Sequence, residues 1–293
     1  MNTRPNNSPA ALRPTPSPVA DAAPAGNSRG VPPRHPAEQA QTPAHPVTAD
    51  LAPPAHPVPA DPATSAHPRQ ATNTPRSSSA AAASATGGVA GRRTTKLLLG
   101  LGVLAGPLNL VVVFTQAFTR DGFDIRKHAG SMLTLGEHGW IQSTNFVLTG
   151  ILVILGAAGL KRAMGTTAAV LLTIFGAGTA AGGLFLPDPA LGFPTGAPEG
   201  QGSWHGAAHF AAGGIGFIAF IACCVVVGNH FRRTSAPQWA AASYVTGAFF
   251  LAAFAGIASG SASETLTLGF WAAIVIAWVW LTATLNRFRL SAR

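Results

Sequence analysis

The sequence predicts an all-α membrane protein, a bundle of six transmembrane helices that follows a disordered N-terminal tail. Charged residues make up 10% of the chain, whereas a typical soluble domain contains about 25%. From Leu97 onward the sequence divides into six apolar stretches of about twenty residues, the length that crosses a hydrocarbon core of about 30 Å. Basic and acidic residues gather at opposite ends of these stretches, as expected of a multi-pass topology.

Residues 1–91 are predicted to form the disordered tail, and residues 92–293 the transmembrane domain. The tail is rich in Pro, Ala, Ser and Thr, has almost no large aliphatic residues and contains no aromatic ones. Such a segment buries too little apolar surface to offset the entropy lost on ordering. We expect it to be cytoplasmic and to offer an attachment point for a soluble protein partner.

Each apolar stretch is expected to form one helix. The six helices are predicted over Leu97–Phe118, Trp140–Leu160, Thr166–Leu186, His205–Gly228, Trp239–Ala258 and Thr265–Leu285. Glycine pairs four positions apart predict close approach of neighbouring helix backbones; they occur in Gly102-x-x-x-Gly106, Gly178-x-x-x-Gly182 and Gly256-x-x-x-Gly260.

The distribution of charge predicts the orientation of the bundle. Ten basic residues fall on one side of the six helices: Arg92, Arg93, Lys96, Lys161, Arg162, Arg232, Arg233, Arg287, Arg289 and Arg293. The other side receives three, Arg120, Arg126 and Lys127, and also every carboxylate after residue 91. Cytoplasmic loops of membrane proteins carry an excess of Lys and Arg. We therefore expect the protein to lie in the plasma membrane with both chain ends in the cytoplasm.

Composition also argues against several functional classes. The net charge of +9 does not indicate nucleic-acid binding, because the basic residues lie beside apolar segments and form no basic face. Cys223 and Cys224 are adjacent within an apolar segment, so they are expected to be small apolar fillers. No nucleotide-binding or nucleophile-elbow motif occurs in the bundle. Membrane lipids are the expected partners, and no organic cofactor is indicated.

Ionisable groups at membrane depth are the default functional hypothesis, and here they gather on the outer side. His205 and His209 lie four residues apart and therefore on one face of a helix. With Asp188 and His138 they are candidate zinc ligands, and His128, Glu137 and Glu264 complete a polar outer cluster. Alternatively these residues form a substrate pocket or only structural hydrogen bonds; Asp188, held between two prolines, also suits a turn or cap.

Three blocks of sequence resemble a bacterial membrane family labelled domain of unknown function 998. They are Leu135–Trp140 with Asn145–Gly150, Gly182–Pro189 and His205–His209. The resemblance covers about residues 97 to 285 and implies a six-helix bundle of unassigned function. The chain departs from the family pattern at Met132–Gly136, where the usual Ser-Glu-Leu-Gly keeps only its end.

Three functions are compatible with these features. The first is a non-catalytic membrane component whose outer pocket binds a lipid, metal or partner. The second is a zinc-dependent hydrolase of lipid-like substrates, in which metal-bound water would be the nucleophile. The third is a small-solute or proton-coupled transporter, although no charged residue falls near the predicted midplane, where coupling sites usually lie.

Overall fold

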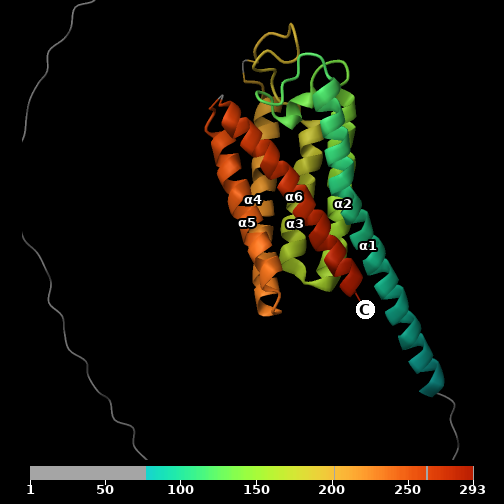
Figure 1. The fold of residues 1–293 in the computed structure, drawn as a ribbon. Helices are drawn as coiled ribbons and strands as arrows, with labels where there is room; N and C mark the ends of the chain where they lie inside the picture. Colours follow the sequence, from blue (N-terminus) through green and yellow to red (C-terminus); the bar gives the residue numbers. More distant parts are fainter. Residues whose placement is uncertain (1–76, 201, 262, 293) are drawn as a thin grey trace, which may run out of the picture. The chain divides into compact units, whose positions relative to one another are not determined.

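The computed structural model describes residues 77–200, 202–261 and 263–292. Within these ranges six long helices and one short 3-10 helix occur (Figure 1): α1 (Ser77–Thr119), η1 (Gly130–Thr134), α2 (Gly139–Ala163), α3 (Thr166–Leu184), α4 (Trp204–Arg233), α5 (Pro237–Ala258) and α6 (Glu264–Ser291). All six α-helices are long and apolar enough to cross a membrane. The predicted six-helix membrane fold is therefore confirmed.

Three helices extend well beyond the predicted apolar stretches. α1 begins at Ser77, inside the segment assigned to the tail. α4 continues to Arg233 instead of ending at Gly228, and α6 continues to Ser291 instead of ending at Leu285. The extensions are polar or alanine-rich, so they carried no transmembrane signal, but alanine and arginine are good helix formers. The part of the predicted tail before residue 77 lies outside the described residues.

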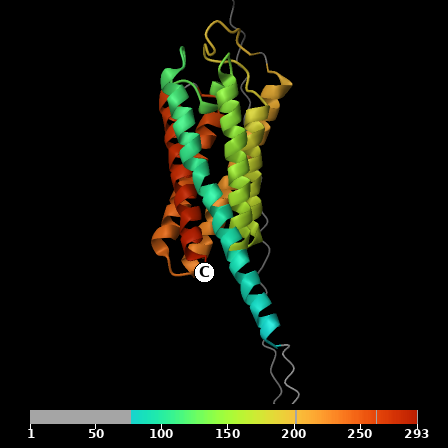
Figure 2. The same cartoon turned by 90° about the vertical axis from the view of Figure 1, so that its right-hand side faces the viewer.

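The six helices form a ring. Each helix packs against the next one along the chain, and α1 also packs against α6, which closes the ring. Figure 2 shows α1 running between α6 and α2. Because each of the five connections joins antiparallel neighbours, α1 begins on the side of the bundle where α6 ends.

Glycines set the spacing of α1 in this ring. A Cβ atom on Gly102 would lie 2.7 Å from Gly156 Cα of α2, and one on Gly106 would lie 2.9 Å from Trp278 O of α6. The predicted pair thus brings α1 close to both of its neighbours, one glycine to each. In the second pair only Gly178 has this role, since its Cβ would lie 2.7 Å from Ala212 O of α4.

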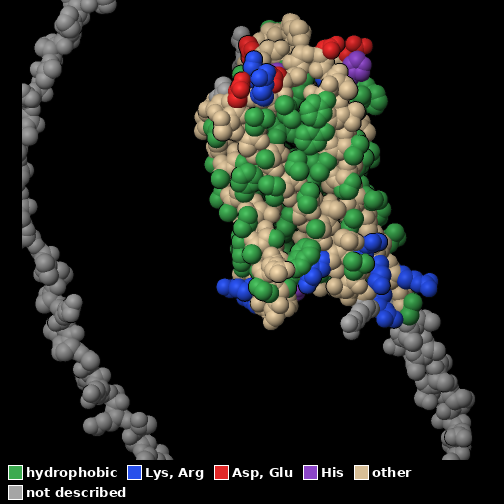
Figure 3. Space-filling view, in the orientation of Figure 1, with side chains coloured by type: hydrophobic (Ala, Val, Ile, Leu, Met, Phe, Trp, Pro, Cys, Tyr) green, Lys and Arg blue, Asp and Glu red, His purple; other side chains and the backbone are tan. Residues whose placement is uncertain are grey.

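The charged residues separate to the two ends of the bundle. The carboxylate end, as we name it, comprises residues 120–138, 185–203 and 259–264, and it holds every Asp and Glu among the described residues. The basic end comprises the start of the apolar part of α1, residues 161–165 and 229–238, and the last turns of α6. Figure 3 shows hydrophobic side chains over the surface between these ends.

Candidate functional site

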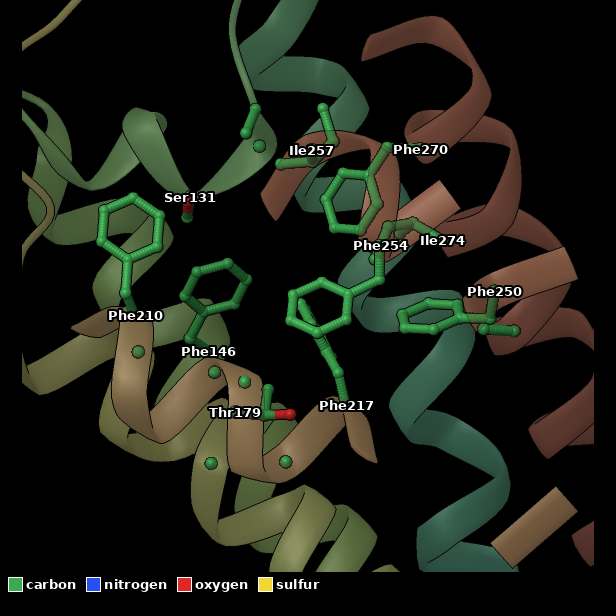
Figure 4. Close-up of a pocket in the computed structure, with 18 of the residues that line it drawn as sticks. Ser131, Phe146, Thr179, Phe210, Phe217, Phe250, Phe254, Ile257, Phe270 and Ile274 are labelled. Atoms are coloured by element: carbon green, nitrogen blue, oxygen red, sulfur yellow. The ribbon is translucent and has the colours of Figure 1, made fainter. Parts of the chain in front are cut away.

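A cavity of about 540 Å³ lies inside the ring, toward the carboxylate end (Figure 4). Its walls are mostly aromatic and aliphatic side chains and glycine backbone. All six helices contribute to it, for example through Asn109, Phe146, Thr179, Phe217, Phe254 and Ile274. η1 contributes Gly130 and Ser131, and the preceding Ala129 also lines the cavity. The cavity is therefore a feature of the whole ring, assembled from residues far apart in the sequence.

Glycines leave the space that the cavity occupies. A Cβ atom on Gly213 of α4 would meet no atom within 4 Å. On Gly214 it would lie 3.7 Å from the Phe254 ring, and on Gly182 it would lie 3.7 Å from the His209 ring, which are ordinary contacts. Side chains at these positions would thus fit without backbone movement, and their absence keeps the interior empty.

The cavity reaches the surface at the carboxylate end, beside α4 and α5. Most of its wall is buried, with Trp271 and Trp278 each 5% exposed. Phe210 of α4, by contrast, is 68% exposed, and Ala258 and Gly260 at the end of α5 are also exposed. An occupant can therefore enter between these residues from the apolar surroundings of the helices.

The described residues that line the cavity include no Asp, Glu, Lys or Arg. The polar side chains in the lining are Asn109, Ser131, Thr179 and His209. The Thr179 hydroxyl is already used, because it donates to Phe175 O in its own helix at 2.9 Å. The environment thus suits an uncharged, largely apolar molecule, since a charge placed there would have no counter-ion.

Behind the cavity wall, a network of amide side chains joins α1 to α2. Gln116 Nε2 and Asn145 Nδ2 both donate to Gln142 Oε1, at 2.8 and 3.2 Å. The Thr149 hydroxyl donates to Asn145 Oδ1 at 3.3 Å. These side chains are all buried. The hydrogen bond from Gln116 to Gln142 ties α1 to α2. Two other atoms of the network, Gln116 Oε1 and Gln142 Nε2, have no partner among the described residues.

His128 links two of the interhelix segments at the carboxylate end to each other and to α6. Its Nδ1 accepts a hydrogen bond from the Asp124 backbone N–H at 2.9 Å, and its Nε2 donates to Leu191 O at 3.1 Å. Its backbone oxygen accepts from the Trp271 indole of α6 at 3.0 Å. His128 is 2% exposed. It therefore holds residues 120–138, residues 185–203 and α6 in one cap, and both of its ring nitrogens are occupied.

Arginines reinforce this cap. Arg120 donates to Leu133 O and Leu135 O, at 3.2 and 2.7 Å, and its guanidinium lies 5.6 Å from the centre of the Phe193 ring. Partial burial lowers the pKa of Arg120. The side-chain hydrogen bond from Arg126 lowers the pKa of Asp124 to about 2, and the same pairing raises the pKa of Arg126. Asp124 is thus ionised at neutral pH and acts as a fixed charge.

The predicted zinc ligands have separate surroundings. His205 is exposed, with its ring centre 3.6 Å from that of Trp204. Asp188 accepts a hydrogen bond from the backbone N–H of Ser203, the N-cap residue of α4, at 3.0 Å, so its charge lies at a helix N-terminus. His138 is exposed and directly precedes α2.

His209 turns inward and is buried. Its Nδ1 lies 2.8 Å from Phe185 O, just beyond the last turn of α3. In the part of the chain that the structure describes, no three His, Cys, Asp or Glu side chains form a group able to hold a metal ion. The geometry therefore lends no support to the predicted zinc site. Glu137 is exposed, and Glu264 begins α6 near Arg126.

The cavity was not predicted from the sequence, and its lining residues Asn109, Gly213 and Trp271 were not among the predicted site residues. One local signal was available: the Gly213-Gly214 pair lies between Phe210 and Phe217 in α4. When small residues and aromatic residues share one face of a helix, the small residues leave unfilled space between the aromatic rings.

Comparison with known proteins identifies one family. Neither the curated proteins nor the solved structures include a match to the chain. The family described as "Protein of unknown function (DUF998)" matches residues 103–286, which span α1 from its apolar part through most of α6. On this match, which covers more than half of the sequence, the chain belongs to the DUF998 family of multi-pass membrane proteins.

Proposed function

We propose that this protein is a membrane lipid-binding protein that holds a lipid chain in the cavity at the centre of its ring. The observation that carries the proposal is the cavity itself: about 540 Å³, lined by apolar groups from all six helices and by no charged side chain among the described residues. This volume lies within the range of about 300–1,000 Å³ that is typical of small-molecule pockets. In a membrane, lipid chains are the abundant molecules that match such a lining.

The exposed position of Phe210 supports the same occupant. Its ring lies both at the cavity and on the membrane-facing surface of α4. A lipid can therefore move from the bilayer into the ring without passing through water. The zinc-hydrolase and transporter hypotheses gain no comparable observation, since the lining holds one titratable side chain, His209, among the described residues.

Filling the cavity tests the proposal. Gly213→Phe places a ring where a Cβ atom meets nothing within 4 Å, so the fold should persist while the lipid is displaced. We expect protein purified from its native membrane to carry a lipid in near-stoichiometric amount, and Gly213→Phe to retain less than about a tenth of it, as measured by mass spectrometry.

A matched control is available in α6. A Cβ atom on Gly269 also meets nothing within 4 Å, but Gly269 does not line the cavity. Gly269→Phe should therefore keep the lipid. Equal lipid content in the wild type and both variants, with all three folded, would show that the co-purified lipid lies outside the ring and would overturn the proposal.

We also propose that the carboxylate end faces the outside of the cell and that both chain ends are cytoplasmic, on the basis of the positive-inside rule. Single cysteines introduced as Glu199→Cys and Arg233→Cys mark the two ends. An impermeant maleimide added to intact cells should label Glu199→Cys alone. Cys223 and Cys224 are buried and should not react. Labelling of Arg233→Cys alone would mean the opposite orientation.

A further inference from the structure

Asn109 is the place where the amide network meets the cavity. It is 2% exposed, it lines the cavity, and its side-chain nitrogen Nδ2 has no hydrogen-bond partner. Leaving a buried donor without a partner costs about 1–3 kcal/mol, and the bilayer core supplies no water to replace the missing acceptor. An unpartnered amide at this position therefore points to a group that the described residues do not contain.

The neighbouring amides do not supply that group. Gln116 Oε1 is also without a partner, but Gln116 lies about two turns farther along α1 than Asn109. Gln142 Oε1 already accepts from both Gln116 and Asn145, and Asn145 Oδ1 accepts from Thr149. Asn145 Nδ2 donates to the backbone oxygen of Asn109 at 3.5 Å and does not bond to the Asn109 side chain. The terminal torsion of an asparagine is broad, so the Asn109 amide can turn its donor toward the cavity.

His209 presents the complementary group. Its Nδ1 lies 2.8 Å from a carbonyl oxygen, which can only accept, so Nδ1 carries the proton. In the neutral ring Nε2 is then an acceptor. His209 lines the same cavity. The lining thus combines an amide donor with an imidazole acceptor in an otherwise apolar wall.

From this pairing we infer that the lipid bound in the ring is uncharged and carries a hydroxyl group, as a long-chain or polyprenyl alcohol does. A hydroxyl accepts from the Asn109 amide and can donate to an imidazole nitrogen, and it brings no charge into a lining without counter-ions. The inference rests on the proposed function, because it specifies the chemistry of the lipid held in the same cavity.

The test compares a long-chain alcohol with the alkane of equal length. Each competes for a photoactivatable analogue of the alcohol on purified full-length protein in phosphatidylcholine nanodiscs. We expect the alcohol to bind about tenfold more tightly than the alkane, the effect of one or two hydrogen bonds in a site without water. In Asn109→Leu the preference should fall below about twofold, with alkane binding unchanged.

Thr267→Val is the matched control, since it removes a buried hydroxyl that is bonded to Ser263 O at the start of its own helix and does not line the cavity. It should keep the tenfold preference. Equal binding of alcohol and alkane by the wild type would overturn the hydroxyl inference and leave the lipid-binding function standing. Binding of neither compound would overturn the proposed function itself. The wild-type comparison decides between these outcomes even if Asn109→Leu fails to fold.

Discussion

Gly150→Val is expected to lower the free energy of unfolding by about 3 kcal/mol or more, one of the two largest effects that we predict. Gly150 of α2 lies against the backbone of α3. A Cβ atom on it would overlap the Gly176 carbonyl oxygen and lie 2.8 Å from Ala180 Cβ; one on Gly176 would lie 2.8 Å from Gly150 O. Overpacking costs about 1–3 kcal/mol even when side chains can yield, and backbone atoms yield less.

The measurement is thermal unfolding of the purified protein in detergent. Gly269→Val is the control, because it adds the same side chain to another helical glycine where a Cβ atom meets nothing within 4 Å. Both variants carry the same intrinsic cost of placing a β-branched valine in a helix. A melting temperature for Gly150→Val equal to that of Gly269→Val would show that α2 and α3 separate easily and that their glycine contact does not hold the ring.

The helices were predictable because membrane insertion imposes strong local constraints. A stretch such as Trp239–Ala258 must be helical if it crosses the bilayer, since no other local structure satisfies its backbone. The helix ends were less predictable where the chain leaves the membrane, as at Ser77, because hydropathy no longer decides there. The helix α1 could be located from its apolar residues, but its polar extension could not.

The two histidines illustrate the limit for the site. His205 and His209 share one face of α4, as their spacing predicted, but they lie on opposite sides of the surface boundary. His205 is exposed beside Trp204, while His209 is buried against Phe185 O. Spacing along a helix predicts the direction in which a side chain points, but not whether neighbouring segments bury it. The different burial of the two histidines could therefore be found only from the tertiary structure.

The cavity was beyond prediction for a related reason. Empty space depends on what six helices fail to fill together, and a local pattern such as the Gly213-Gly214 pair does not establish it alone. Gly178 of α3 and Gly213 of α4 belong to helices that each contain several glycines. A Cβ atom on Gly178 would lie 2.7 Å from Ala212 O, whereas one on Gly213 would meet nothing. The first glycine brings two helices into contact and the second leaves room for an occupant, and only packing distinguishes them.

Trp271→Ala should lower the free energy of unfolding by about 3–5 kcal/mol, the usual cost of deleting a large buried aromatic side chain. Trp271 is 5% exposed, lines the cavity, packs against Phe114 and Phe123, and donates to His128 O. Because the indole joins α6 to the cap, its loss should also release residues 123–135. We expect faster amide hydrogen exchange in that segment.

Trp280→Ala separates the two effects. Trp280 is also 5% exposed on α6, but its indole donates to Ser243 of α5, away from the cap. It should cost similar stability while exchange in residues 123–135 stays at the wild-type rate. Trp271→Phe should lose less than Trp271→Ala, about 1–3 kcal/mol, because it keeps one aromatic ring while it removes the second ring and one hydrogen bond. If Trp280→Ala released the cap equally, the order of the cap would depend on global stability and not on the hydrogen bond from Trp271 to His128. Trp271 also forms part of the cavity wall. The hydrogen bond from Trp271 to His128 would therefore let an occupant of the cavity stabilise the cap.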